Sequence, residues 1–99
     1  MKKYPDLLSP SVNDITKALI EETLAVIRLN KNKTVITPLN LLGCNGAPIA
    51  DNGWVLSQKR RRRKILLILK ELEQDGVLIR RAAKQDFKGI KEVGYDLGE

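Results

Sequence analysis

Residues 57–76 read SQKRRRRKILLILKELEQDG, with six consecutive cations followed by apolar residues at helical spacing. Apolar side chains that recur at i, i+3, i+4 and i+7 form one face of an α-helix and pack against a core. The residues that follow this rule are Ile65, Ile68, Leu69 and Leu72. We therefore predict an amphipathic helix whose first turns are strongly basic.

Both ends of this helix are marked in the sequence. Ser57 is a candidate N-cap, and Gly76 is a candidate for the left-handed residue that ends the helix. With Gly76 in that role, Leu72 and Val77 occupy the positions at which a Schellman motif makes an apolar contact. We therefore expect one helix that begins at Ser57 and stops just before Gly76.

The six cations Lys59–Lys64 oppose the electrostatics of the helix they begin. A helix N-terminus carries about half a positive charge, so each cation near it costs roughly 0.3–1 kcal/mol. The pairs Lys59/Arg63 and Arg60/Lys64 add like-charge repulsion of ~0.2–0.5 kcal/mol each. Phosphate groups favour both helix N-termini and arginine side chains. The run therefore indicates a polyanion-binding surface, because sequences often break local preferences for the sake of function.

A helical projection divides the basic run into two groups. Arg61 and Arg62 lie close to the apolar face, whereas the other four cations project to the opposite side. Leu67 falls among these four cations, so it is either an exposed leucine or an apolar contact to a partner. The four outward-facing cations are therefore the stronger candidates for ligand contacts.

Length and composition bound the class of protein. The chain has 99 residues, the size of one domain, and its 42% hydrophobic content suits a globular fold. Its longest strictly apolar run has five residues, whereas a transmembrane helix needs ~20. With one cysteine and no histidine, a disulfide within the chain and a zinc site are both excluded. We expect an intracellular, cytoplasmic protein (in the host cytoplasm if it is viral) without cofactor, metal or membrane association.

The positive charge is concentrated in one part of the chain. The net charge is +6; residues 51–70 carry +6, residues 1–50 carry +2 and residues 71–99 carry −2. A solubilising surface, which is the alternative interpretation, normally mixes both signs. A patch of one sign is typical of a protein that binds a polyanion.

The N-terminal region predicts an arm followed by a helix. Residues 1–8 read as a flexible arm and residues 9–99 as one domain. A long amphipathic helix is expected from about Ser9–Ser11 to Asn30, because a serine followed by proline is a helix-start signal. Its apolar residues cover a wide arc, which is explained either by a two-layer core or by a homodimer seam.

The middle of the chain predicts a brief strand over residues 34–36 and then a short helix. Thr37 followed by Pro38 signals the start of this helix, and a glycine signals its end. Residues 43–53 contain many turn formers and read as a loop. Cys44 in this loop is either a small packed residue or one half of a disulfide between two chains.

The C-terminal residues predict a β-hairpin. A first strand is expected over residues 77–83, a loop over residues 84–89 and a return strand over residues 90–97. Gly89 supplies positive φ for the loop. Alternate side chains of the return strand share one face, namely Val93, Tyr95 and Leu97.

The expected elements, taken in order, form a helix-turn-helix followed by a hairpin. Within them, residues 69–81 follow the pattern Leu-x-x-Leu-x-x-x-Gly-apolar-apolar-x-Arg. This pattern resembles the step from recognition helix to wing in the winged-helix family of transcriptional regulators. The resemblance implies an α+β winged helix-turn-helix fold with three helices and a C-terminal two-stranded wing hairpin. Small basic members of this family are common in archaea and in their viruses and plasmids.

The resemblance also implies that the basic helix enters the major groove of double-stranded DNA, while the wing contacts the backbone or the minor groove. The implied DNA-binding residues are Gln58, Lys59, Arg60, Arg61, Arg62, Arg63, Lys64, Arg80, Lys84 and Lys88, with Lys91 as a further wing cation. The chain departs from the family at residues 43–53, because the usual turn has 3–4 residues. We expect a homodimeric, sequence-specific DNA-binding regulator.

The same sequence features bear on other functions. The alternative is a protein–protein interaction module of transcription or replication machinery, motivated by the apolar arc of the first helix and by Leu67. A nuclear import signal is disfavoured, because the basic run continues directly into a helix. RNA binding stays open, although the four aromatic residues are scattered and form no stacking platform. Enzymatic activity is not expected, because no histidine base is present and Cys44 has no activating partner.

Overall fold

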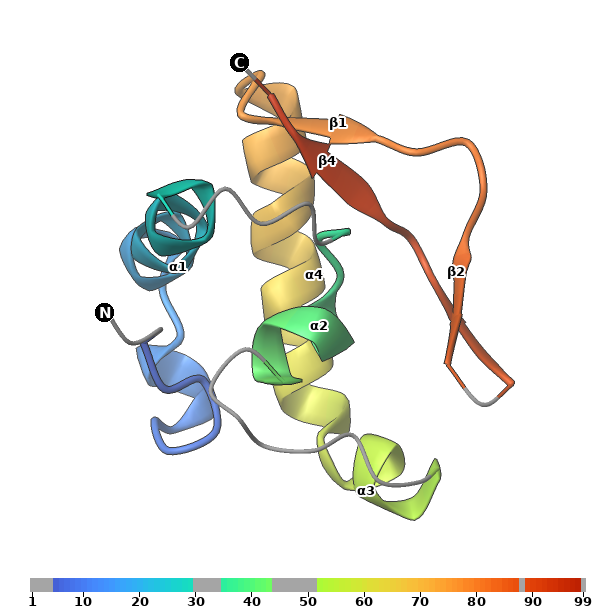
Figure 1. Ribbon diagram of the computed structural model, residues 1–99. Helices are drawn as coiled ribbons and strands as arrows, with labels where there is room; N and C mark the ends of the chain where they lie inside the picture. The colour runs from blue at the N-terminus through green and yellow to red at the C-terminus, as the bar shows by residue number, and fades with distance from the viewer. Residues whose placement is uncertain (1–4, 30–34, 44–51, 88, 99) are drawn as a thin grey trace.

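The computed structural model describes residues 5–29, 35–43, 52–87 and 89–98. Within these ranges the chain has the expected α+β composition, with helices first and antiparallel strands at the C-terminus. The helical elements are η1 (Val12–Asp14), α1 (Lys17–Leu29), α2 (Pro38–Gly43), α3 (Asn52–Ser57) and α4 (Lys59–Gln74). The strands are β1 (Leu78–Arg80), β2 (Gln85–Phe87), β3 (Ile90–Glu92) and β4 (Tyr95–Leu97). Figure 1 shows the long helix α4 between α1 on one side and the hairpin on the other.

The core is built around α4. Its buried side chains are the four that the helical spacing predicts, Ile65, Ile68, Leu69 and Leu72. α4 contacts α1, α2, η1 and β1. Burying one such aliphatic side chain contributes about 1.5–3 kcal/mol, so this face is sufficient to fix the helix on the domain while its opposite face stays exposed.

A Schellman motif closes the C-terminus of α4, as predicted. Gly76 takes a left-handed φ of +82°, and its N–H donates to the Glu73 carbonyl at 3.1 Å. The Val77 N–H donates to the Leu72 carbonyl at 2.9 Å. These two bonds satisfy carbonyls that a helix end leaves without intrahelical partners, and they turn the chain into β1.

The N-terminus of the basic helix differs from the prediction. Ser57 is not its N-cap, because residues 52–57 form the separate helix α3 and the Ser57 hydroxyl donates to the Trp54 carbonyl at 2.6 Å. α4 begins after Gln58, which makes no side-chain capping hydrogen bond. The basic run therefore begins α4, which is a separate helix from α3. Figure 1 shows α3 next to the basic end of α4.

The predicted loop at residues 43–53 was wrong at both edges. Gly43 is the last residue of α2, and Asn52 and Gly53 belong to α3. Residues 44–51, with Cys44, lie outside the described ranges. The described chain thus contains four α-helices where the winged-helix resemblance implies three.

The first predicted helix begins later than expected. Ser9-Pro10 does not start it, because the chain first forms the 3₁₀ turn η1. α1 begins at Lys17, and the Thr16 hydroxyl accepts the Leu19 N–H at 3.2 Å in the manner of an N-cap. The start of α1 is therefore set by the Thr16 cap and not by the Ser9-Pro10 signal.

The described part of the predicted arm is packed on the domain. Leu7 is fully buried in the core, whereas the first four residues lie outside the described ranges. The Ser9 hydroxyl and the Leu8 N–H donate to the Asp6 carboxylate, and these hydrogen bonds hold the pKa of Asp6 below its usual value. The expectation of an arm was therefore wrong for residues 5–8.

The C-terminal strands form one hairpin in two antiparallel segments. β1 pairs with β4, and further along the same hairpin β2 pairs with β3. The register places Leu78 opposite Leu97 and Gln85 opposite Glu92. The predicted loop at residues 84–89 was wrong, because residues 85–87 are strand β2, although Gly89 takes the predicted positive φ of +88°.

The hairpin is joined to the helical part through Ile36. The N–H groups of Ile36 and Tyr95 each donate to the other's carbonyl, at 2.8 and 2.9 Å, so the predicted strand at residues 34–36 is present as a single bridge. Tyr95 is fully buried, and Val93 and Leu97 pack partly buried against the core. The predicted alternation of these three side chains is therefore confirmed.

Replacing Gly76 with alanine tests the left-handed end of α4. A Cβ at Gly76 meets no atom within 4 Å, so the cost comes from the positive φ alone, about 1–2 kcal/mol. Gly76→Asn is the matched control, because asparagine tolerates this conformation. Chemical denaturation would show a larger loss of unfolding free energy for alanine than for asparagine; equal losses would contradict the account.

Candidate nucleic-acid interface

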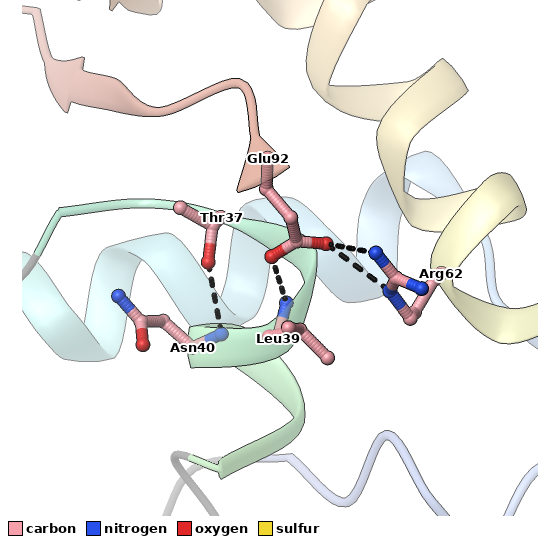
Figure 2. Close-up of polar contacts among 5 residues, drawn as sticks. All are labelled: Thr37, Leu39, Asn40, Arg62 and Glu92. Atoms are coloured by element: carbon pink, nitrogen blue, oxygen red, sulfur yellow. Dashed lines mark hydrogen bonds and ion pairs between the residues drawn. The ribbon is translucent and has the colours of Figure 1, made fainter. Parts of the chain in front are cut away.

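A buried carboxylate joins the hairpin to two helices. Glu92, at the end of β3, accepts the Leu39 N–H of α2 on Oε1 at 3.2 Å. Its Oε2 accepts both Nε and Nη2 of Arg62 on α4, at 3.1 and 3.0 Å. The Glu92 side chain is 5% exposed and that of Arg62 is 19% exposed. Figure 2 shows Glu92 between the two helices, so one side chain ties together α2, α4 and β3.

The same carboxylate completes the N-terminus of α2. The Thr37 hydroxyl accepts the Asn40 N–H at 3.0 Å, as the predicted cap requires. The Asn40 side-chain amide donates back to the Val35 carbonyl at 2.7 Å. Because orphan N–H groups at a helix N-terminus favour negative charge, the Glu92 carboxylate is well placed at Leu39.

Arg61 and Arg62 are engaged within the protein. Arg61 Nη2 donates to the Pro10 carbonyl at 2.8 Å, and Arg62 pairs with Glu92. Both arginines were predicted as DNA-binding residues and also as the two nearest the apolar face. The structure places them on the inner side of α4, where they join it to the N-terminal segment and to the hairpin.

The other four cations of the run form no contact of this kind, and three of them are exposed. Lys59, Arg60 and Arg63 are exposed and Lys64 is half-buried. None of these four forms a hydrogen bond or ion pair with any residue that the structure describes. The predicted division of the basic run is therefore confirmed for Lys59, Arg60 and Arg63, whereas Lys64 is half-buried like Arg61 and Arg62.

Two further residues of this region differ in exposure. Leu67 is 54% exposed on the same helix, so it is an apolar side chain among outward-facing cations. Gln58 is half-buried; its Nε2 donates to the Ser57 hydroxyl at 3.2 Å, and its Oε1 is buried without a partner in the described structure.

A groove separates the N-terminal half of α4 from the hairpin. Its volume is about 340 Å³. Residues of α2, α4 and the hairpin line it, namely Pro38, Lys59, Arg62, Arg63, Leu66, Lys84, Lys91, Glu92 and Val93. The lining contains five cations and one carboxylate, so its net charge is +4. The carboxylate, Glu92, is paired with Arg62. We call this feature the basic groove.

The predicted wing cations fall into different environments. Lys84 and Lys91 are exposed and line the basic groove. Arg80 lies 3.5 Å from Glu73 of α4, which places it near the opposite end of that helix. Lys88 lies outside the described ranges.

Comparison with protein-family models, with curated proteins and with solved structures gives no match. Among the described residues, no helix is long and apolar enough to cross a membrane. The same residues contain no group of three or more histidine, cysteine or acidic side chains that could hold a metal ion.

Replacing Glu92 with alanine tests its role as the junction of three elements. Removing one partner of a buried ion pair costs about 3–5 kcal/mol, because the remaining charge is left without compensation. For a domain of this size each kcal/mol lowers Tm by about 4–8 °C. Thermal denaturation followed by circular dichroism measures the loss.

Asp75→Ala is the control for that experiment. It removes the partner of Lys17, with which Asp75 forms an ion pair at 2.5 Å, and the two side chains are 48% and 41% exposed. An exposed pair of this kind contributes at most about 1 kcal/mol. Similar losses for the two variants would contradict the assigned role of Glu92.

Proposed function

We propose that this chain is a winged helix-turn-helix regulator that binds double-stranded DNA in a sequence-specific manner, with α4 as recognition helix and the hairpin as wing. The order of the elements supports the proposal: α1, the bridge residue Ile36, α2, then α4 and the hairpin. The hairpin follows α4 directly through the Schellman motif at Gly76.

The observation that carries the proposal is a set of cations, on two elements that face a common groove, that form no ion pair with a described residue. α4 contributes Lys59 and Arg63, and the hairpin contributes Lys84 and Lys91. Side chains held together with like charge are destabilising on their own, whereas a phosphate backbone neutralises them and releases counterions. A polyanion therefore explains an arrangement that protein stability alone does not favour.

The exposed side of α4 has the chemistry that a major groove selects. A groove about 12 Å wide admits an α-helix. Arg60 can form paired hydrogen bonds with guanine O6 and N7, and Leu67 can contact a thymine methyl group. Lys84 and Lys91 would then contact the phosphates beside the groove, which positions the helix without reading sequence.

One feature distinguishes this chain from the usual helix-turn-helix. A turn of 3–4 residues normally separates the two helices of that motif, whereas here α3 lies between α2 and α4 in the chain. α3 precedes the basic end of α4 (Figure 1). In our proposal α2 still supports α4, because the two helices are in contact and share the Glu92 carboxylate.

A second candidate function is contact with another protein, either a second copy of the chain or a component of transcription or replication machinery. Exposed hydrophobic side chains favour it, namely Leu29, Leu56, Leu67 and Ile79. Binding of such a partner that survives Arg60→Glu and Arg63→Glu would support this candidate over DNA binding.

Arg63→Ala tests the proposed function. Wild-type affinity for duplex DNA should fall steeply between 50 and 200 mM salt, by ~10³–10⁵-fold if 6–10 phosphates are contacted. Losing one phosphate contact should weaken binding and reduce the salt slope by about 1. Fluorescence anisotropy with a labelled duplex at several salt concentrations measures both quantities.

Lys17→Ala is the matched control, because it removes the same charge beside Asp75 at the far end of α4. The rise of an α-helix places residue 75 about 18 Å from residue 63 along the axis. The control should keep the wild-type salt slope. A wild-type protein without salt dependence, or equal effects of the two variants, would overturn the proposal.

A further inference from the structure

The basic groove has an apolar part that a surface for phosphate contacts alone does not need. Pro38 of α2, Leu66 of α4 and Val93, which follows β3, lie in its lining beside the cations. Small-molecule sites combine apolar walls with a few charged groups, and a volume of about 340 Å³ lies in their range of ~300–1,000 Å³. The groove therefore has the composition of a site for a ligand with both an anionic and an apolar part.

The free cations of the groove form two pairs on opposite elements. Lys59 and Arg63 are four residues apart on α4 and so lie on one side of the helix. On the hairpin, Lys91 stands opposite Asp86, and Lys84 precedes Asp86 by two residues. Lys84 and Lys91 are therefore diagonal neighbours on one face of the hairpin.

Two acids lie near these cations: Asp86 shares the hairpin face of Lys84 and Lys91, and Glu92 lines the groove. Asp86 Oδ1 accepts the Gly89 N–H at 2.9 Å within the hairpin turn, and Asp86 does not line the groove. Both oxygens of Glu92 accept hydrogen bonds from Leu39 and Arg62. The four cations thus form no ion pair with a described residue, although Asp86 lies beside Lys91 on the hairpin. A phosphate between the two cation pairs would relieve the repulsion that remains.

We propose that the basic groove binds one nucleotide unit, with its phosphate on Lys59, Arg63, Lys84 and Lys91 and its sugar and base against Pro38, Leu66 and Val93. The unit comes either from a nucleic-acid chain or from a free nucleotide, since both present the same phosphate beside the same apolar group. The inference rests on the proposed function only for the first source.

Titration of the ¹⁵N-labelled full chain with deoxyadenosine monophosphate, followed by NMR amide shifts, tests the inference. The nucleotide should shift amides of residues 59–66 and 84–93 and leave those of α1 in place. Inorganic phosphate should bind the same residues more weakly, because it lacks the apolar part. Deoxyadenosine without phosphate should shift none of them.

The variant Lys84→Ala/Lys91→Ala should weaken nucleotide binding about tenfold or more, because charge-assisted hydrogen bonds are lost. Both side chains are exposed, and the amide spectrum itself reports that the variant is folded. Lys17→Ala/Arg28→Ala removes the same charge from α1 and should leave binding unchanged. Equal weakening by the two double variants would overturn the inference.

A duplex added to the nucleotide-loaded protein separates this inference from the proposed function. Displacement of the nucleotide by the duplex supports a nucleic-acid chain as the source. Nucleotide binding without duplex binding supports a free nucleotide and overturns the proposed function. Duplex binding without any nucleotide-induced shift in the groove overturns the inference and leaves the proposed function in place. Inorganic phosphate that binds as tightly as the nucleotide also overturns it.

Discussion

The bonds of Glu92 to Arg62 and to the Leu39 N–H fix the position of the hairpin relative to the helices. A buried carboxylate without such partners costs several kcal/mol, so the three elements are held together by the requirement to satisfy one group. Together with the Ile36–Tyr95 bridge and the apolar side chains that the hairpin packs on the core, Glu92 holds the hairpin alongside the charged half of α4, where the basic groove lies.

The division of α4 into an inner and an outer side follows from its packing on the core. Its apolar side chains fix one face on the core, and Arg61 and Arg62 extend this inner side through contacts with Pro10 and Glu92. Of the remaining cations, Lys59, Arg60 and Arg63 are exposed and Lys64 is half-buried, and none has a described partner. An excess of like charge at a helix N-terminus reduces stability, and such local losses are characteristic of sites selected for binding.

The sequence was sufficient wherever local chemistry decides the structure. Helical spacing predicted the buried face of α4, Gly76 predicted the Schellman motif, and Thr37 predicted the cap of α2. It was insufficient where a tertiary contact or a competing local signal decides. Ser9-Pro10 and Ser57 are good caps in isolation, but Thr16 starts α1 and α3 contains Ser57. Glu92 could not be recognised as buried, because it lies outside the predicted apolar face of Val93, Tyr95 and Leu97, and no local signal indicates that Arg62 lies beside it.

A selection from a pool of random DNA duplexes tests the central claim most directly, because the claim is that α4 reads base sequence while the hairpin holds the backbone. The account predicts that the wild-type protein enriches a defined motif, and that Arg60→Ala relaxes the preference at one or two positions within it. A pool without enrichment, or a motif unchanged by Arg60→Ala, would contradict the account.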